Sequence, residues 1–208
     1  MSKKVQRIIM ILLLVGLNVV ADQVSKKIAR SNLNYDERIE VVGDYFILLM
    51  VENEGAFLSL GDELPEVMRK ILLIILPSII LLFLMFSIMV RADMQRGFMI
   101  GVCFIIGGGI GNMIDRIIHG SVTDFLNIGI ENLRTGIFNF ADMSISAGFI
   151  IILVGYVMEL NRNRKLKQEQ KAVQQENQEI PAIKPDDNPV NDESSTSPEE
   201  EDSAKSEV

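Results

Sequence analysis

Four stretches of the chain are apolar over lengths that suit membrane spans, and polar segments separate them. The clearest, residues 71–90, contains no charged side chain. A hydrocarbon core of about 30 Å needs about 20 apolar residues in a helix, so this stretch predicts one complete span. Three more apolar stretches begin near Ile8, Gly97 and Ala141. The pattern predicts four transmembrane helices, at about residues 8–28, 67–90, 97–118 and 141–160.

The first of these stretches is the shortest. Residues 8–21 are apolar apart from Asn18, and this length alone does not cross a membrane. The helix therefore continues past Asp22 towards Lys26 and Lys27, whose long side chains can snorkel to the interface. A basic start before such a run also fits a signal peptide. Three further apolar stretches follow, and Ala21 lies in a poor cleavage context, so the sequence favours a span.

Residues 37–60, between the first two predicted helices, have a different sequence pattern. They hold short, partly alternating pieces rich in Val, Ile, Tyr and Phe, separated by Gly43-Asp44 and by Asn53-Glu54-Gly55. This pattern predicts a small antiparallel sheet of two to four strands. Such a sheet is too small to be stable alone, so we expect it to rest on the membrane surface or on the helix ends. The predicted fold class is a mainly α membrane protein with a small extracytoplasmic β-sheet.

Basic residues give the expected orientation. With four spans, the three basic clusters fall on one side of the membrane: Lys3, Lys4 and Arg7; Arg91 and Arg96; and Arg162, Arg164, Lys165 and Lys167. The positive-inside rule makes that side the cytoplasm. Both termini are therefore predicted to be cytoplasmic, and residues 1–160 form the membrane domain.

The net charge of −8 belongs to the C-terminal tail. From Glu176 onward the chain has 11 acidic residues and only two lysines, Lys184 and Lys205. Residues 161–208 are predicted to be a cytoplasmic, largely disordered acidic tail, helical for a few turns to Gln178 at most. We predict no nucleic-acid partner. The single cysteine, Cys103, allows no internal disulfide, and the single histidine, His119, excludes zinc sites that need two.

Eight polar residues are expected at, or just outside, the outer ends of the predicted helices. They are Asp22, Asn53, Asn112, Asp115, Arg116, Asp124, Asn139 and Asp142. An ionisable group at membrane depth costs about 3 kcal/mol, so it is a functional candidate by default. Asp115 and Arg116 lie one turn from Asn112 and could form a structural charge network. Asp124 and Asp142 flank one connection, which could bring them together.

Two adjacent carboxylates share one proton, because each raises the pKa of the other. Such a pair can hydrolyse a peptide bond: the ionised member takes a proton from water and the protonated member polarises the carbonyl. From the residues alone, two alternatives stay open. One is a polytopic transporter or proton relay that uses intramembrane carboxylates, and the other is a purely structural or interaction role.

Five motifs occur in a characteristic order: D-Q-x-S-K at 22–26, N-x-G-A at 53–56, G-G-x-x-G-N-x-x-D-R at 107–116, H-G-x-V-x-D-F at 119–125, and F-N-x-A-D at 138–142. Together they resemble the lipoprotein signal peptidases (signal peptidase II), aspartyl peptidases of the bacterial inner membrane. The resemblance covers roughly residues 8–160.

The resemblance implies an intramembrane endopeptidase that removes the signal peptide from diacylglyceryl-modified prolipoproteins, before the lipidated cysteine. It implies Asp124 and Asp142 as the catalytic pair, and an active site near the periplasmic face. The substrate site would contain Asn53, Gly55, Asn112, Arg116 and Asn139, and structural support would come from Asp22, Asp115, Gly108 and Gly111. No metal or other cofactor is expected, and the partners would be lipidated prolipoproteins and membrane lipids.

Overall fold

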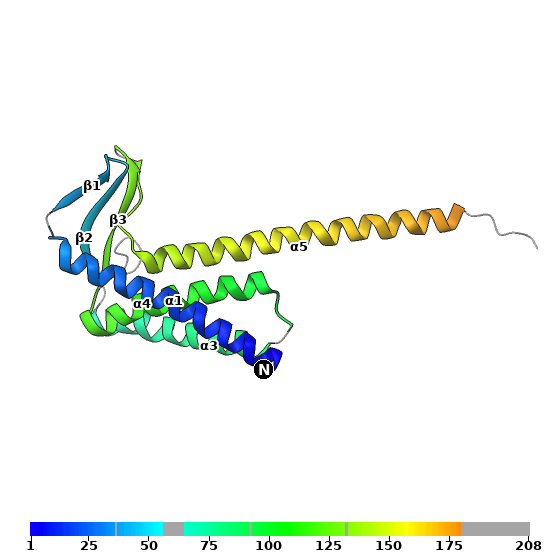
Figure 1. The fold of residues 1–208 in the computed structure, drawn as a ribbon, viewed down its shortest axis with the longest axis horizontal. Helices are drawn as coiled ribbons and strands as arrows, with labels where there is room; N and C mark the ends of the chain where they lie inside the picture. Colours follow the sequence, from blue (N-terminus) through cyan, green and yellow to red (C-terminus); the bar gives the residue numbers. More distant parts are fainter. Residues whose placement is uncertain (36, 56–64, 92, 132, 180–208) are drawn as a thin grey trace, which may run out of the picture. The chain divides into compact units, whose positions relative to one another are not determined.

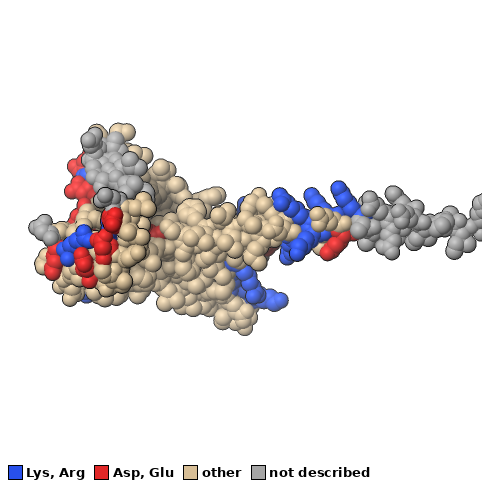
Figure 2. Space-filling model, turned by 90° about the horizontal axis from the view of Figure 1, so that it is seen from above, with Lys and Arg blue, Asp and Glu red and all other residues tan. Residues whose placement is uncertain are grey.

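The computed structural model describes residues 1–35, 37–55, 65–91, 93–131 and 133–179, with side chains as far as Lys171. Four helical stretches in these residues are long and apolar enough to cross a membrane: α1 (Lys3–Asn32), the run Glu66–Val90, α4 (Arg96–His119) and the first part of α5 (Phe140–Glu179). The predicted fold class, four such helices with a small antiparallel sheet, is confirmed. On the face seen in Figure 2, an uncharged surface lies between charged side chains at the sheet end and Lys and Arg side chains at the other end of the spanning helices.

Residues Met1–Arg164 form one compact unit, in which glycines of α4 bring the neighbouring helices close. A Cβ atom at any of three α4 glycines would overlap a neighbour, which is how small residues allow close helix contact. The contacts are Gly107 with Asn18 of α1, Gly109 with Leu81 of the second spanning helix, and Gly101 with Gly148 of α5. Helix α4 therefore runs along all three of its partners. At Gly97, near the start of α4, an added Cβ would meet open space.

The second spanning helix consists of three consecutive pieces: α2 (Glu66–Lys70), the π-helical turn η2 (Ile71–Ile75) and α3 (Leu76–Val90). Pro77 lies in the first turn of α3. Proline has no N–H, and its ring clashes with the carbonyl four residues earlier in a regular helix. The disturbance expected at Pro77 therefore takes the form of a π-helical turn immediately before it. Figure 1 shows α3 beside α4 and α1.

The sheet has four antiparallel strands in the order β1 (Arg38–Val42), β2 (Phe46–Asn53), β3 (Val122–Ile130) and β4 (Leu133–Arg134). The first two come from the segment predicted to be β-structure, and its residues 56–60 lie outside the described part of the chain. Strands β3 and β4 come from the connection between the third and fourth spans, which the sequence pattern did not identify as β-structure. Figure 1 shows the sheet at one end of the helices.

Hydrophobic residues at the end of α1 and on the sheet form a small core of their own. Ala29 of α1 and Leu33, the C-cap of that helix, pack with Met50 of β2 and with Phe125 and Leu126 of β3. This contact supplies the burial that an isolated small sheet lacks. It also fixes the base of β3, the strand that carries Asp124.

The second compact unit begins at Lys165. Its described residues continue helix α5 as far as Glu179, close to Gln178, where the sequence analysis ends the helical part of the tail. The disorder predicted for the rest of the tail falls on residues outside the described part of the chain.

Candidate active site

Asp124 lies in the middle of the sheet, on β3. Its Cα is paired with that of Val51 on β2, where the register shifts between Leu48 and Val51. Such irregularities re-aim side chains and are common near active sites. Asp124 is only 3% exposed. Successive side chains on a strand alternate between its faces, so Asp124 lies on the face opposite Thr123 and Phe125.

Asp142 is held by the first turn of α5. The side chain of Asn139 accepts a hydrogen bond from the backbone N–H of Asp142 (3.0 Å), and the Asp142 carboxylate accepts one from the backbone N–H of Asn139 (3.2 Å). This reciprocal pair is a capping box, in which each side chain satisfies an otherwise free N–H group. The Asp142 carboxylate therefore lies at the helix N-terminus, where the backbone dipoles carry a partial positive charge.

Two asparagines join the aspartates. The Asn139 amide donates to Asp124 Oδ1 at 2.6 Å and to Asn112 Oδ1 at 3.1 Å. The amide of Asn112, on α4, in turn donates to Asp142 Oδ1 at 2.9 Å. The other oxygen of Asp124 accepts from the Asn53 amide at 3.0 Å. Three segments far apart in the sequence thus hold the two carboxylates in one hydrogen-bonded network.

Both aspartates line a cavity of about 250 Å³. Its polar wall also includes Asn53, Asn112 and Arg116, and its apolar wall includes Leu73, Pro77, Met113 and Ile145. Arg116 donates to the backbone carbonyl of Gly55 at 2.7 Å. Among the residues that the structure describes, no group of three His, Cys, Asp or Glu side chains is arranged to hold a metal.

The environment of Asp124 raises the pKa of its carboxyl group. Burial, together with the negative charge of Asp142, raises the pKa of Asp124 from its ordinary value of 3.8 to about 6. Hydrogen bonds from Asn53 and Asn139 partly oppose this rise, because they stabilise the ionised carboxylate. A raised pKa suits the carboxylate that holds the proton in acid–base chemistry by an aspartate pair.

A buried charge cluster supports this site from the α1 side. Lys26 Nζ lies 2.9 Å from Asp22 Oδ2 and 3.2 Å from Asp115 Oδ2, and all three residues are fully buried. Asp22 Oδ1 also accepts from the backbone N–H of Ala141 at 2.8 Å, beside Asp142. Lys26 donates to Asn112 Oδ1 at 2.8 Å. The cluster therefore contacts both the first turn of α5 and the asparagine that binds Asp142.

A family model described as signal peptidase (SPase) II matches residues 14–158. The chain belongs to this family. It is 36% identical over 162 residues to a lipoprotein signal peptidase of Treponema denticola, covering 74% of this chain and 92% of that one. It is 34% identical over 148 residues to a lipoprotein signal peptidase of Neisseria gonorrhoeae, covering 71% and 88%.

Solved structures agree with this membership. A bacterial membrane enzyme solved by the in meso method matches with a TM-score of 0.64 and 25% identity, over 74% of this chain and 90% of that one. A second such enzyme matches with a TM-score of 0.61 and 26% identity, over 71% and 92%. The chain is thus an aspartic-type peptidase of the signal peptidase II family and a multi-pass membrane protein.

The structure divides the predicted site residues of this signal peptidase II into two groups. One group lines the cavity or donates directly to an aspartate: Asn53, Asn112, Arg116 and Asn139. The other lies outside the cavity and packs behind it: Asp22, Asp115, Gly108 and Gly111. A Cβ at Gly108 would overlap the carbonyl oxygen of Ala141, and one at Gly111 would overlap the Asp22 carboxylate. Gly55 contributes its backbone carbonyl, which accepts a hydrogen bond from Arg116.

Lys26, Asp115 and Arg116 make contacts that differ from those expected from the sequence. Lys26 does not snorkel to the interface: it is fully buried between Asp22 and Asp115. The Asp22/Lys26 spacing of four residues, which places opposite charges on one helix face, is a signal that could have identified it. Asp115 pairs with Lys26 and Arg30, whereas Arg116 faces the cavity. These neighbours therefore do not form one network.

Sequence reasoning also missed a polar group at the base of β3. Thr123 is fully buried, and its hydroxyl donates to Glu52 at 2.7 Å and accepts from Arg30 at 2.8 Å. Ser121 donates to the other oxygen of Glu52 at 2.6 Å. These contacts join β2, β3 and α1 beside Asp124. Their partners are remote in sequence, so no local pattern identifies them.

Proposed function

We propose that this chain is a lipoprotein signal peptidase that cleaves diacylglyceryl-modified prolipoproteins before the lipidated cysteine, with Asp124 and Asp142 as its catalytic pair. The observation that supports the pair most directly is its geometry. Two carboxylates from different elements line one cavity, and Asn112 and Asn139 link them. The named relatives are lipoprotein signal peptidases, which supports the substrate class.

In the proposed mechanism the two aspartates have opposite protonation states. Asp142 at the helix N-terminus is ionised and takes a proton from the attacking water, while protonated Asp124 donates to the scissile carbonyl oxygen. Water oxygen bonds to the carbonyl carbon and gives a tetrahedral intermediate. When the C–N bond breaks, the proton held by Asp142 passes to the leaving amine, and the Asp124 proton returns from the collapsing hydroxyl. No covalent enzyme intermediate forms.

The cavity suits a substrate that is anchored in the membrane. Its walls combine polar groups around the aspartates with Leu73, Pro77 and Ile145 on spanning helices. A lipid anchor on one side of the scissile bond and an apolar signal helix on the other would supply much of the orientation that the reaction needs. We place the site at the periplasmic face of the inner membrane and both termini in the cytoplasm, from the distribution of basic residues.

The test uses the purified full-length enzyme in bicelles with a diacylglyceryl-modified prolipoprotein, with products identified by mass spectrometry. We expect Asp124→Asn and Asp142→Asn each to reduce kcat by about a thousandfold or more, as loss of an essential acid or base does. Asp44→Asn is the control, because Asp44 is an exposed carboxylate on the sheet. Cleavage by either dyad variant at more than a tenth of the wild-type rate would refute the assignment. If the mature product begins at a residue other than the lipidated cysteine, the proposed cleavage specificity is refuted.

A further inference from the structure

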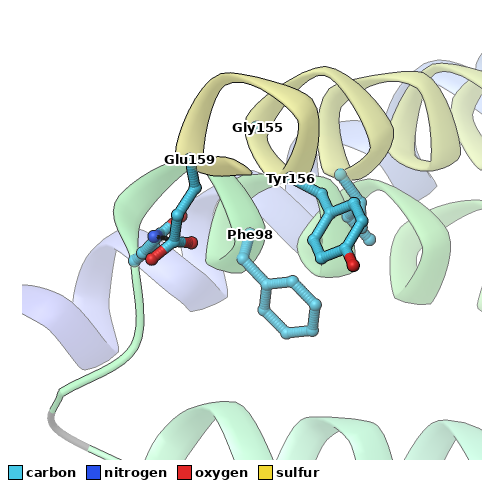
Figure 3. A pocket seen from close by; sticks show the side chains of 6 residues that line it. Phe98, Gly155, Tyr156 and Glu159 are labelled. Carbon is cyan, nitrogen blue, oxygen red and sulfur yellow. Dashed lines mark hydrogen bonds between the residues drawn. The ribbon is translucent and has the colours of Figure 1, made fainter. Parts of the chain in front are cut away.

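A second cavity, of about 380 Å³, lies between the same two helices that frame the aspartates, at their other ends. It is lined by Gln95, the N-cap of α4, by Phe98 of α4, and by Ile152, Gly155, Tyr156 and Glu159 of α5. Figure 3 shows Phe98, Tyr156 and Glu159 projecting from the junction of the two helices into the same space. The proposed mechanism uses none of these residues.

Both cavities lie along one groove. Steps of three and four residues lead from Phe98 to Arg116 along α4 and from Ile145 to Tyr156 along α5, so each pair lies on a single helix face and has one member in each cavity. Other faces of α4 are occupied, since Gly107 backs onto α1 and Gly109 onto Leu81 of α3. The side of α4 and α5 that carries both cavities is the groove; α4 forms its floor, and Pro77 of α3 lines it at the aspartate end.

The length of the groove matches a signal peptide. Asp142 and Glu159 are separated by about 25 Å along α5, from the helical rise of 1.5 Å per residue. A signal peptide has a positively charged start, an apolar segment of about 7–15 residues and a small-residue cleavage site. A helical signal peptide whose cleavage site lies at the aspartates would extend along the groove towards Glu159. If its apolar segment has about 15 residues, its basic start would lie at Glu159.

The charge at this end of the groove also complements the basic start of a signal peptide. The side of the membrane reached by these helix ends is basic, with Arg91, Arg96 and Arg162 in the sequence, yet the residue lining the cavity is an acid. Glu159 is half-buried, and the Gln95 amide donates to its carboxylate. The Phe98 and Tyr156 rings beside it can add cation–π attraction.

We propose that Glu159, positioned by Gln95, recognises the basic N-terminal region of the signal peptide while the apolar segment lies in the groove. This inference rests on the proposed function. It adds to that function a specificity site at the opposite end of the spanning helices from the aspartates. Glu159 acts on binding and not on the bond-breaking step.

The test varies charge on both partners. Lipidated prolipoproteins whose N-terminal region carries lysines, glutamines or glutamates are cleaved in bicelles by wild type, Glu159→Gln and Glu159→Lys. We expect Glu159→Gln to raise KM about fivefold for the lysine substrate, a size typical of one partly exposed ion pair, with kcat unchanged. KM for the glutamine substrate should not change. Glu159→Lys should favour the glutamate substrate. Asp93→Asn, which removes an exposed acid before α4, is the control and should change nothing.

The outcomes separate the two proposals. If wild type cleaves none of the three substrates, the proposed function fails. If wild type cleaves them with equal KM, or if Glu159→Gln changes KM equally for all three, the charge-recognition proposal fails. An effect of Glu159→Gln that requires phosphatidylethanolamine, but not a basic substrate, would assign the cavity to a lipid headgroup and overturn the proposal. Thermal unfolding of each variant identifies any loss caused by misfolding.

Discussion

Replacing Lys26 by methionine tests whether the buried charge cluster supports the active site. Lys26 Nζ contacts Asp22, Asp115 and Asn112 within 3.2 Å and is shielded from solvent. Methionine keeps most of the apolar stem but removes the charge. Arg30 still lies 3.1 Å from Asp115 in the variant, so Asp22 is the carboxylate left without a cation.

The expected loss of stability is large. Removing one partner of a buried ion pair costs about 3–5 kcal/mol, because an uncompensated charge stays buried. For a chain of this size, that loss lowers Tm by about 10 °C. Hydrogen bonds to Asp22 from Ala141 (2.8 Å) and Gln23 (3.2 Å) remain, so the lower end of the range is the better expectation. A second change, Asp22→Asn, removes the unpaired charge and should recover at least half of the loss.

The assay is thermal unfolding in detergent micelles, with cleavage of a lipidated prolipoprotein measured on the same samples. Arg38→Met is the matched control, since Arg38 pairs with Asp44 and Glu40 on the exposed sheet, where such pairs contribute below about 1 kcal/mol. If Lys26→Met unfolds within 2 °C of wild type, or if Asp22→Asn and Lys26→Met lower Tm additively, the argument from uncompensated charge is wrong.

Two further expectations concern Asp124 and Gly108. The pKa of Asp124, about 6 in the folded protein, lies above its ordinary value of 3.8, so the stability that this group contributes is greatest at low pH and falls as pH rises between these values. The Tm of Asp124→Asn minus the Tm of wild type should therefore increase from pH 4 to pH 7. A Tm difference that does not depend on pH would contradict this expectation. Gly108→Ala should lower both Tm and kcat, because its Cβ would overlap the Ala141 carbonyl next to Asp142, whereas Gly97→Ala, which meets open space, should leave both unchanged.

The sequence predicts the helices and the proximity of Asp124 and Asp142 well, because both signals are local. Apolar runs of suitable length mark spans directly, and glycine spacing in α4 indicates close helix contact. The convergence of Asp124 and Asp142 followed from their positions at two ends of one connection. The capping box at Asn139 and Asp142 could also have been recognised, because an N-cap residue followed three positions later by an acid precedes an apolar run.

Strand β3 was missed because its pairing and its polar contacts are both non-local. Alternation of apolar and polar residues is the usual strand signal, but Thr123, Asp124 and Asn127 are all buried on β3. Their polar groups are satisfied by partners such as Glu52, up to 71 residues away in sequence. A strand with polar residues on both faces looks like a polar connection until its partners are known.

Stability does not explain why the cluster behind the active site is charged. Replacing a buried ion pair by well-packed apolar residues is often neutral or stabilising. An ammonium group, however, can only donate hydrogen bonds, so Lys26 requires the Asn112 oxygen to face it, and the Asn112 amide then faces Asp142. Asp22 likewise holds the backbone N–H of Ala141 one residue before Asp142. An apolar cluster would supply neither constraint. Orientation of the α5 first turn is therefore the physical reason for a lysine at this depth.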